Sequence, residues 1–111
     1  MLNGQQIYNK VRAYLLKQNE QSIYRGECKY RGPRGLKCAA GVLISDENYI
    51  SSFEGKMINE AVEVVQALID SGVDPVWLDL VRGLQSVHDR YQPTGWPLQL
   101  TYLAKSYGLK P

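Results

Sequence analysis

The sequence predicts a mostly α-helical fold with a small β component (α+β), about four main helices packed on one short β-hairpin. Four segments repeat apolar residues at intervals of three and four, which places those residues on one face of a helix. Between the first two of these segments lies a Gly-Pro-Arg-Gly turn whose flanks alternate between apolar and basic residues. Such alternation is typical of half-buried strands, so we expect the hairpin there.

The length and composition indicate one globular domain spanning residues 1–111. Apolar residues make up 44% of the chain and charged residues 22%, which are ordinary values for such a domain. No apolar run reaches the ~20 residues of a membrane span, and the N-terminus lacks the basic start and apolar stretch of a secretory signal. We therefore expect a cytoplasmic protein that does not associate with membranes and keeps its two cysteines reduced.

The first helix is expected from near Asn3 to Asn19. Its apolar stripe consists of Ile7, Val11, Tyr14 and Leu15. The polar run 18–22 should end this helix, and the chain then leads into the hairpin.

The turn Gly32-Pro33-Arg34-Gly35 defines the expected hairpin. Pro33 fixes φ for the first central position of a type I turn, and Gly35 can adopt the left-handed conformation that follows. The result is a three-residue loop that pairs Gly32 with Leu36. A two-residue loop would mix apolar and basic residues on each face, so the three-residue loop is favoured. One face then holds Cys28, Tyr30, Leu36, Cys38 and Ala40, and the other holds Lys29, Arg31 and Lys37, with Arg34 at the tip.

The two cysteines are expected to be structural thiols. In this register Cys28 and Cys38 lie diagonally, about 7–8 Å apart, whereas a disulfide prefers Cα atoms about 5.5–6 Å apart. Nine residues separate them, while zinc-binding cysteines are usually spaced by about two to four. The alternative is that the two cysteines form a disulfide or bind a metal together. Asp46 and Glu54 could also offer a metal two carboxylates, but carboxylates in separate loops are weak evidence for a site. We expect no metal and no cofactor.

Residues 38–44 are small and apolar, and their pattern fits either an extended strand or a helix. Ser45 to Tyr49 has the pattern of a cap followed by the acidic first turn of a short helix. A loop over 51–55 should follow.

Three further helices are expected in the second half of the chain. Apolar spacing predicts one helix that starts at Asn59 or slightly earlier and has Gly72 at its C-terminal end. Asp74 and the proline after it begin the next, which should run to about Tyr91. The last helix restarts over 94–97 and ends at Gly108.

One ordered set of residues runs through nearly the whole chain: Cys28, Tyr30, Arg31, Gly32, Gly35, Lys37, Cys38, Ala39, Gly41, Leu43, Ile44, Asp46, Tyr49, Glu54, Gly55, Leu84, Gln85, His88, Asp89, Trp96, Leu103 and Ala104. This pattern resembles a family of short hypothetical proteins found in tailed phages, prophages and bacterial accessory regions, most specifically between Tyr30 and Ile44. The resemblance implies a cytoplasmic, phage-associated accessory protein. Such proteins often act on the host or on its defences, but the resemblance implies no particular chemistry.

The basic residues around the turn form the best candidate site. Guanidinium groups beside the amides of a glycine turn suit a phosphate. Nearby aromatic rings could stack a base or a sugar: Tyr24, Tyr30, Tyr49 and Trp96. The expected ligand-binding residues are Lys29, Tyr30, Arg31, Arg34, Lys37, His88 and Trp96. The alternative is that these charges only keep the hairpin edges from pairing with other chains.

We therefore expect a non-catalytic protein that binds a phosphorylated small molecule or an acidic host or defence partner through the basic hairpin. Nucleic acid is the alternative ligand of the same face, because four cations could contact phosphates. Against it, the net charge is only +2.

His88 and Asp89 admit two interpretations. In one, His88 is half-buried and bonds a carbonyl or the nearby turn; in the other, it contacts a ligand or acts as a general base. With Cys28 or Cys38 the pair could form a thiol triad, which is the alternative that the protein is a small enzyme. Because no partner for His88 is visible in the sequence, the structural role is favoured and no catalytic residue is assigned.

Aromatic residues concentrate in the C-terminal third, in greater number than so small a domain can bury beside its aliphatic stripes: Trp77, Tyr91, Trp96, Tyr102 and Tyr107. The last helix has two partly apolar sides, one with Leu98, Tyr102 and Lys105 and the other with Leu100, Leu103, Ala104 and Tyr107. One side should pack on the core and the other on a second molecule. We expect a homodimer joined through the C-terminal helices.

Overall fold

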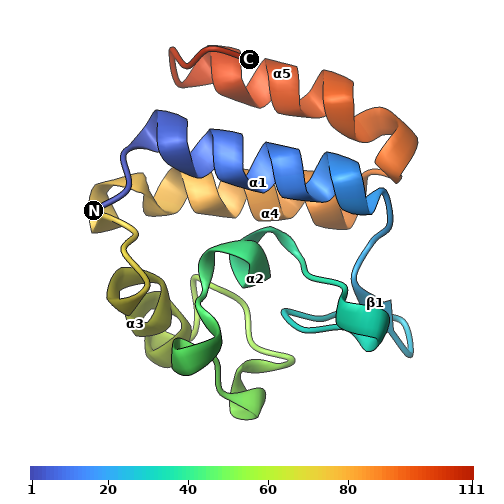
Figure 1. The fold of residues 1–111 in the computed structure, drawn as a ribbon, viewed down its shortest axis with the longest axis vertical. Helices are drawn as coiled ribbons and strands as arrows, with labels where there is room; N and C mark the ends of the chain where they lie inside the picture. Colours follow the sequence, from blue (N-terminus) through green and yellow to red (C-terminus); the bar gives the residue numbers. More distant parts are fainter.

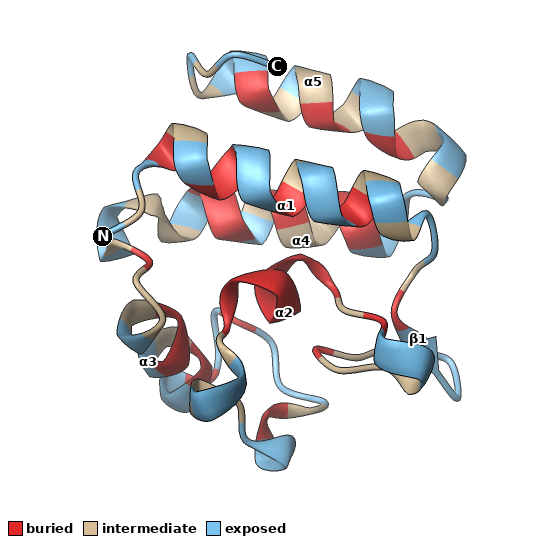
Figure 2. Cartoon of the chain, in the orientation of Figure 1, coloured by how far each residue is buried: buried red, intermediate tan, exposed pale blue.

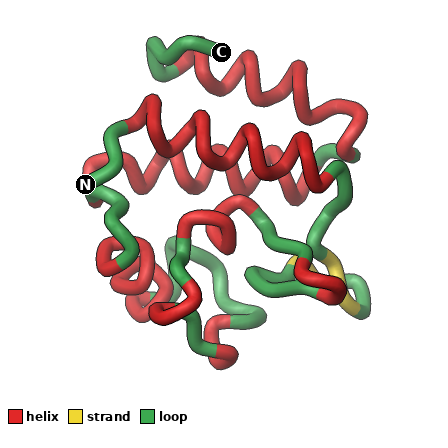
Figure 3. Tube along the Cα trace, viewed as in Figure 1, coloured by secondary structure: helices red, strands yellow, loops and turns green.

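The computed structural model describes all residues, 1–111. Of the five α-helices, the three long ones lie roughly parallel or antiparallel to one another. The two shorter helices and a hairpin lie on one side of them (Figure 1). The elements are α1 (Gly4–Gln18), β1 (Ile23–Tyr24), β2 (Glu27–Cys28), α2 (Ala39–Leu43), α3 (Val62–Asp70), α4 (Leu78–Arg90) and α5 (Trp96–Ser106). Helices and loops form nearly all of the chain, and strand is confined to the one hairpin (Figure 3). The mostly α class with a small antiparallel hairpin is confirmed.

Helix α1 begins and ends at local signals in the sequence. The Asn3 side chain accepts a hydrogen bond from Gln6 N at 2.8 Å, and Gln6 Oε1 accepts one from Asn3 N at 2.9 Å. This reciprocal pair satisfies amides that the first turn of a helix leaves unpaired. Asn19 ends the helix in the left-handed conformation with φ of 50°. The expected span from Asn3 to Asn19 is confirmed.

Helices α4 and α5 also follow the expected boundaries. The Asp74 side chain accepts a hydrogen bond from Val76 N at 3.0 Å, and a 3-10 turn over Pro75–Trp77 leads into α4. A second 3-10 turn, Pro93–Gly95, separates α4 from α5, and Gly108 follows α5 with φ of 69°. Both expected ends are confirmed to within a residue or two.

Helix α3 is shorter than expected, because its first regular residue is Val62. The loop 55–59 before it is tied to another segment instead: Tyr30 Oη donates to Lys56 O at 2.5 Å, and Ile58 is buried. Met57 is 61% exposed, so it does not belong to the buried stripe of the helix. The expected start near Asn59 is therefore wrong.

The hairpin lies earlier in the chain than expected. Ile23 pairs with Cys28 and Tyr24 with Glu27, around a turn at Arg25 and Gly26 with φ of 51° and 80°. Two positive φ values are the signature of the type I′ turn that joins short antiparallel strands. The expected strands on either side of Pro33-Arg34-Gly35 are not present, and that location is wrong.

The segment 29–38 lacks strands because side chains form hydrogen bonds with its backbone N–H and C=O groups. Gln18 Oε1 accepts from Lys37 N at 3.0 Å, and Gln18 Nε2 donates to Lys37 O at 2.9 Å. The Glu54 carboxylate accepts from the amides of Tyr30 and Arg31 at 2.9 and 3.0 Å. One bond of the expected loop does form, Gly32 N to Leu36 O at 2.7 Å. Polar backbone groups thus find partners without a second strand.

Residues 39–43, for which strand and helix were both open, form α2. All five of its residues are buried, and the Ala40 amide donates to Gln85 Oε1 on α4 at 3.0 Å. A side chain on Gly41 would clash with the Tyr30 carbonyl oxygen. The glycine therefore lets α2 approach the backbone of residue 30 directly.

The core lies between the long helices and the elements beside them, as the buried residues in Figure 2 show. α1 packs on α2, α4 and α5, and α2 also packs on α4. The largest fully buried side chains include Trp96, Tyr8, Phe53 and Leu84. None of the helices combines the length and the apolar character that crossing a bilayer requires.

Candidate functional site

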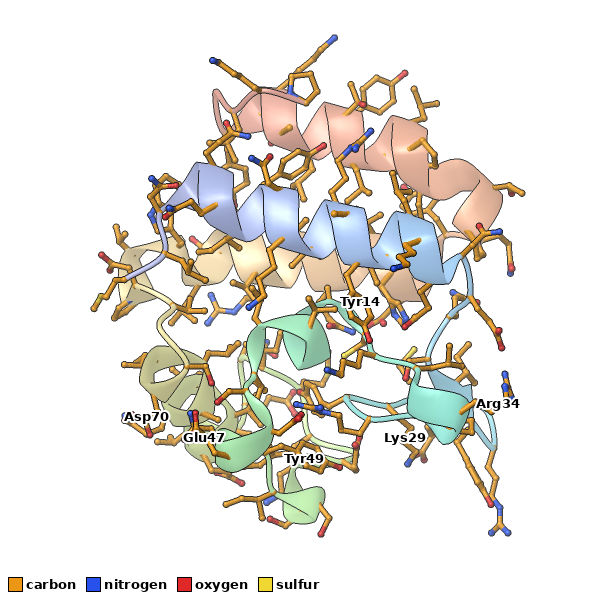
Figure 4. The ribbon with its side chains drawn as sticks, in the orientation of Figure 1. Tyr14, Lys29, Arg34, Glu47, Tyr49 and Asp70 are labelled. Carbon is orange, nitrogen blue, oxygen red and sulfur yellow. The ribbon has the colours of Figure 1, made fainter.

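The four expected basic residues do not form one free cluster. Lys29 pairs with Glu27 at 3.3 Å, and Arg34 pairs with Glu20. The labelled side chains of Lys29 and Arg34 lie near the hairpin, apart from Tyr14 beside α1 (Figure 4). Exposed ion pairs of this kind have small net energies, but they partly neutralise the surface.

Arg31 is held in a defined position by several groups. Its Nη1 donates to Asp46 Oδ1 at 2.5 Å and its Nη2 to Ile44 O at 2.6 Å. The guanidinium lies 5.0 Å from the centroid of the Tyr49 ring, and Tyr49 Oη donates to Glu54 Oε2 at 2.7 Å. The buried Arg31 Nε has no hydrogen-bond partner. Asp46 and Glu54 thus hold this segment in place through hydrogen bonds, rather than forming a joint metal site.

Lys37 is the basic residue that remains available. Its ammonium lies 5.5 Å from the centroid of the Tyr14 ring and forms no hydrogen bond or ion pair with the protein. Burial lowers the pKa of Lys37, and the nearby charges of Arg31 and Lys10 lower it further, while Asp46 acts in the opposite direction. Lys37 is therefore within electrostatic reach of two further cations, of which Arg31 is already paired with Asp46. We call Lys10, Tyr14, Arg31, Lys37 and Tyr49 the basic–aromatic patch.

Two members of the basic–aromatic patch, Lys10 and Tyr14, were not expected from the sequence. Tyr14 was assigned to the buried stripe of the first helix, yet it is 36% exposed. Lys10 and Tyr14 are four residues apart and so lie on one face of α1, which was a usable signal. The sequence alone does not show that this face of α1 lies against residues 31–37, because that contact depends on the tertiary fold.

Tyr30, His88 and Trp96 lie in the core and away from the basic–aromatic patch. His88 and Trp96 are fully buried, with ring centroids 5.6 Å apart in a stacked arrangement. Trp96 Nε1 donates to the Tyr91 carbonyl oxygen at 3.1 Å. The hydroxyl of Tyr30 is taken by Lys56 O. These three side chains hold elements together rather than face a ligand of the patch.

The structure does bring Cys28, His88 and Asp89 together, with one ligand atom of each within 4.8 Å of the others. His88 Nε2 accepts a hydrogen bond from Ser22 N at 2.9 Å, so the ring proton is on Nδ1, which donates to Asp89 Oδ1 at 2.8 Å. Burial raises the pKa of Cys28 to about 12, and its hydrogen bond to Asp89 and the charge of Asp89 raise it too. The thiol is therefore neutral at pH 7, with no base to ionise it.

The same arrangement does not suit a metal ion. A neutral imidazole that binds a metal through Nδ1 carries its proton on Nε2. In this structure that proton would point at the Ser22 N–H, so the ring would lose a buried hydrogen bond. Burial raises the pKa of Asp89, but the hydrogen bonds from His88 and Cys28 outweigh it, so the pKa lies below its usual range. The group is a structural network built on a carboxylate.

A cleft of about 470 Å³ opens beside this network and is called the α4 cleft here. It lies between β2, the loop 55–59 and α4, and its lining includes Cys28, Tyr30 and Cys38. Both cysteines are free. The α4 cleft shares no residue with the basic–aromatic patch. Residues 28–38 contribute to both, with Arg31 and Lys37 in the patch and Cys28, Tyr30 and Cys38 in the cleft.

No protein-family model, no curated protein and no solved structure matches this chain. Function must therefore be argued from the chemistry of the two sites.

Proposed function

We propose that the protein is a non-catalytic binding protein that captures a phosphorylated small molecule on the basic–aromatic patch. The observation that carries this proposal is the Lys37 ammonium, which has no acceptor and lies near the charges of Arg31 and Lys10. Cations held close together repel each other, and the repulsion is stronger where water is partly excluded. A bound phosphate would offset that repulsion and give the Lys37 ammonium an acceptor.

The aromatic rings support the proposal because they fix the cations in advance. Lys37 lies over Tyr14, and Arg31 over Tyr49, so both charges have limited freedom before a ligand arrives. Cations that are already in position lose less conformational entropy on binding.

The resemblance to short phage and prophage proteins adds a setting to this proposal. In that setting the protein is an accessory protein in the host cytoplasm, and a host or defence component supplies the anionic group. An acidic protein is the second source of such a group. Nucleic acid is less favoured, because Lys29, Arg31 and Arg34 are already paired with carboxylates and few cations remain free for successive phosphates.

Calorimetric titration tests the proposal with three named probes: pyrophosphate, adenosine monophosphate and an oligo-aspartate peptide. Pyrophosphate or the nucleotide should bind more tightly than the peptide. Lys37→Gln should weaken binding at least tenfold, or about 1.4 kcal/mol. Lys110→Gln near the C-terminus removes the same charge outside the patch and should change nothing. Absence of binding by all probes, or equal affinity for Lys37→Gln and the natural protein, would contradict the proposal.

We also propose that the protein is a homodimer joined through its C-terminal helices. On α5, Leu100 and Ala104 are fully buried, whereas Leu98 and Tyr102 are 54% and 57% exposed. Tyr91, at the end of α4, is also exposed (41%). An exposed apolar face of this kind is typical of a surface that contacts a second molecule.

A further inference from the structure

We propose that the α4 cleft is a second binding site, for a small zwitterionic molecule that carries an ammonium and a carboxylate on an apolar frame, such as an amino acid or a dipeptide. This site is independent of the anion site proposed above. Its volume of about 470 Å³ falls within the ~300–1,000 Å³ of small-molecule sites.

The charged residues that line the α4 cleft differ in whether the protein already pairs them with an opposite charge. Five charged residues line it: Glu27, Lys56, Arg82, Asp89 and Arg90. Three of them are paired with residues outside the lining, Glu27 with Lys29 at 3.3 Å, Lys56 with Glu63 at 2.5 Å and Arg82 with Asp79 at 2.6 Å. Asp89 is held only by the neutral donors Gln85, His88 and Cys28, and Arg90 forms no ion pair, so these two charges have no oppositely charged partner in the protein.

Asp89 offers a prepared acceptor. Gln85 Nε2 and His88 Nδ1 both donate to its Oδ1, at 2.8 Å each, and the Cys28 thiol is a third donor to the carboxylate. The side chain is 34% exposed, so a ligand can reach it. A carboxylate that is fixed by neutral donors and still reaches the surface favours an ammonium or another strong donor.

Arg90 supplies the opposite charge. It is exposed on the last turn of α4 and forms no ion pair or hydrogen bond with the protein. Asp89 and Arg90 line one cleft without pairing with each other. Two charges of opposite sign that have no charged partner in the protein are complementary to a ligand that carries both signs.

The remaining surface is suited to an apolar frame. Cys28, Cys38, Tyr30 and Ile58 are buried or half-buried at the cleft, and Met57 is exposed beside it. Both thiols are neutral, since the pKa of each is raised to about 12 by burial above all. A thiol behaves as a small apolar group in such a setting.

An NMR titration of the full-length, ¹⁵N-labelled protein tests this proposal. The probes are free amino acids and apolar dipeptides, added one at a time, each with its N-acetylated and C-amidated forms. At least one unmodified probe should shift the amides of Cys28, residues 55–59 and Asp89, while those of Lys37 and Tyr14 stay in place. Either blocking group should weaken binding at least tenfold, because each removes one charge.

Arg90→Gln, which changes an exposed side chain, should also weaken binding at least tenfold. Arg25→Gln in the hairpin turn removes an equal charge outside the cleft and is the matched control. The proposal is overturned if no probe shifts the cleft amides, if blocked and free forms bind equally, or if Arg90→Gln binds as well as Arg25→Gln. A parallel titration with pyrophosphate reports on the basic–aromatic patch alone, so the two proposals fail separately.

Discussion

His88 joins three parts of the chain through one ring. Nε2 accepts from the Ser22 amide before the hairpin, Nδ1 donates to Asp89, and the ring face stacks on Trp96 at the start of α5. Gln21 adds a further link, because its Nε2 donates to the His88 carbonyl oxygen at 2.9 Å. His88, which was a candidate general base, thus links the hairpin to α4.

Replacing His88 should therefore destabilise the fold strongly. His88→Ala leaves the buried Ser22 amide without an acceptor and opens a cavity, and we expect a loss of about 3 kcal/mol in the free energy of unfolding. His88→Gln can restore an acceptor and should lose clearly less. Urea denaturation of both variants measures this. A loss below about 0.5 kcal/mol for His88→Ala would show that the network contributes nothing.

The two thiols give a second prediction, on pH. Burial raises the pKa of Cys38 to about 12, so the folded chain keeps a proton there that the unfolded chain releases above about pH 9. Stability should therefore fall as pH rises from about 9 toward 12. Denaturation midpoints across this range should fall less steeply for Cys38→Ala than for the natural protein.

The same thiols should react slowly with iodoacetamide at neutral pH in the folded protein and rapidly after denaturation. Fast reaction of Cys28 in the native state would return the enzyme interpretation to consideration.

At the scale of elements, local signals predicted α1, α4 and α5, because their caps and breaks involve residues close in sequence, such as Asn3 with Gln6. The hairpin was misplaced for the opposite reason. Gln18 and Glu54 satisfy the backbone of residues 30, 31 and 37, and neither contact is visible in a local pattern. Of the expected site, Arg31 and Lys37 did come together, while His88 and Trp96 lie in the core. Burial of those two depends on how α4 and α5 pack.

Gly41 in α2 gives a test at this scale in which two physical effects have opposite signs. Helix propensity alone predicts that Gly41→Ala stabilises by roughly 1 kcal/mol. The clash with the Tyr30 carbonyl predicts destabilisation instead, by about 2 kcal/mol or more, because backbone must move. Gly95→Ala is the control, since its added Cβ would only meet Tyr91 Cβ at 3.8 Å. Thermal unfolding of Gly41→Ala above the natural midpoint would contradict the packing described for α2.

For the whole molecule, the exposed face of α5 bears on assembly. Static light scattering at micromolar concentration should give at least twice the chain mass of 12.6 kDa. Tyr102→Glu places a charge at the proposed interface and should yield monomers without loss of stability, because Tyr102 is already 57% exposed. A monomer for the natural protein at that concentration would leave this face without the proposed partner.

The most direct test of the central claim is the titration of the Lys37 ammonium itself, followed by NMR of the lysine side chains with and without pyrophosphate. In the free protein Lys37 should titrate below the ordinary lysine value of about 10.4, because burial and the charges of Arg31 and Lys10 disfavour its charged form. A bound phosphate favours the charged form, so pyrophosphate should raise the pKa of Lys37, and affinity should fall as pH rises through that pKa. A Lys37 that titrates as an ordinary lysine and does not respond to pyrophosphate would contradict the proposed anion site.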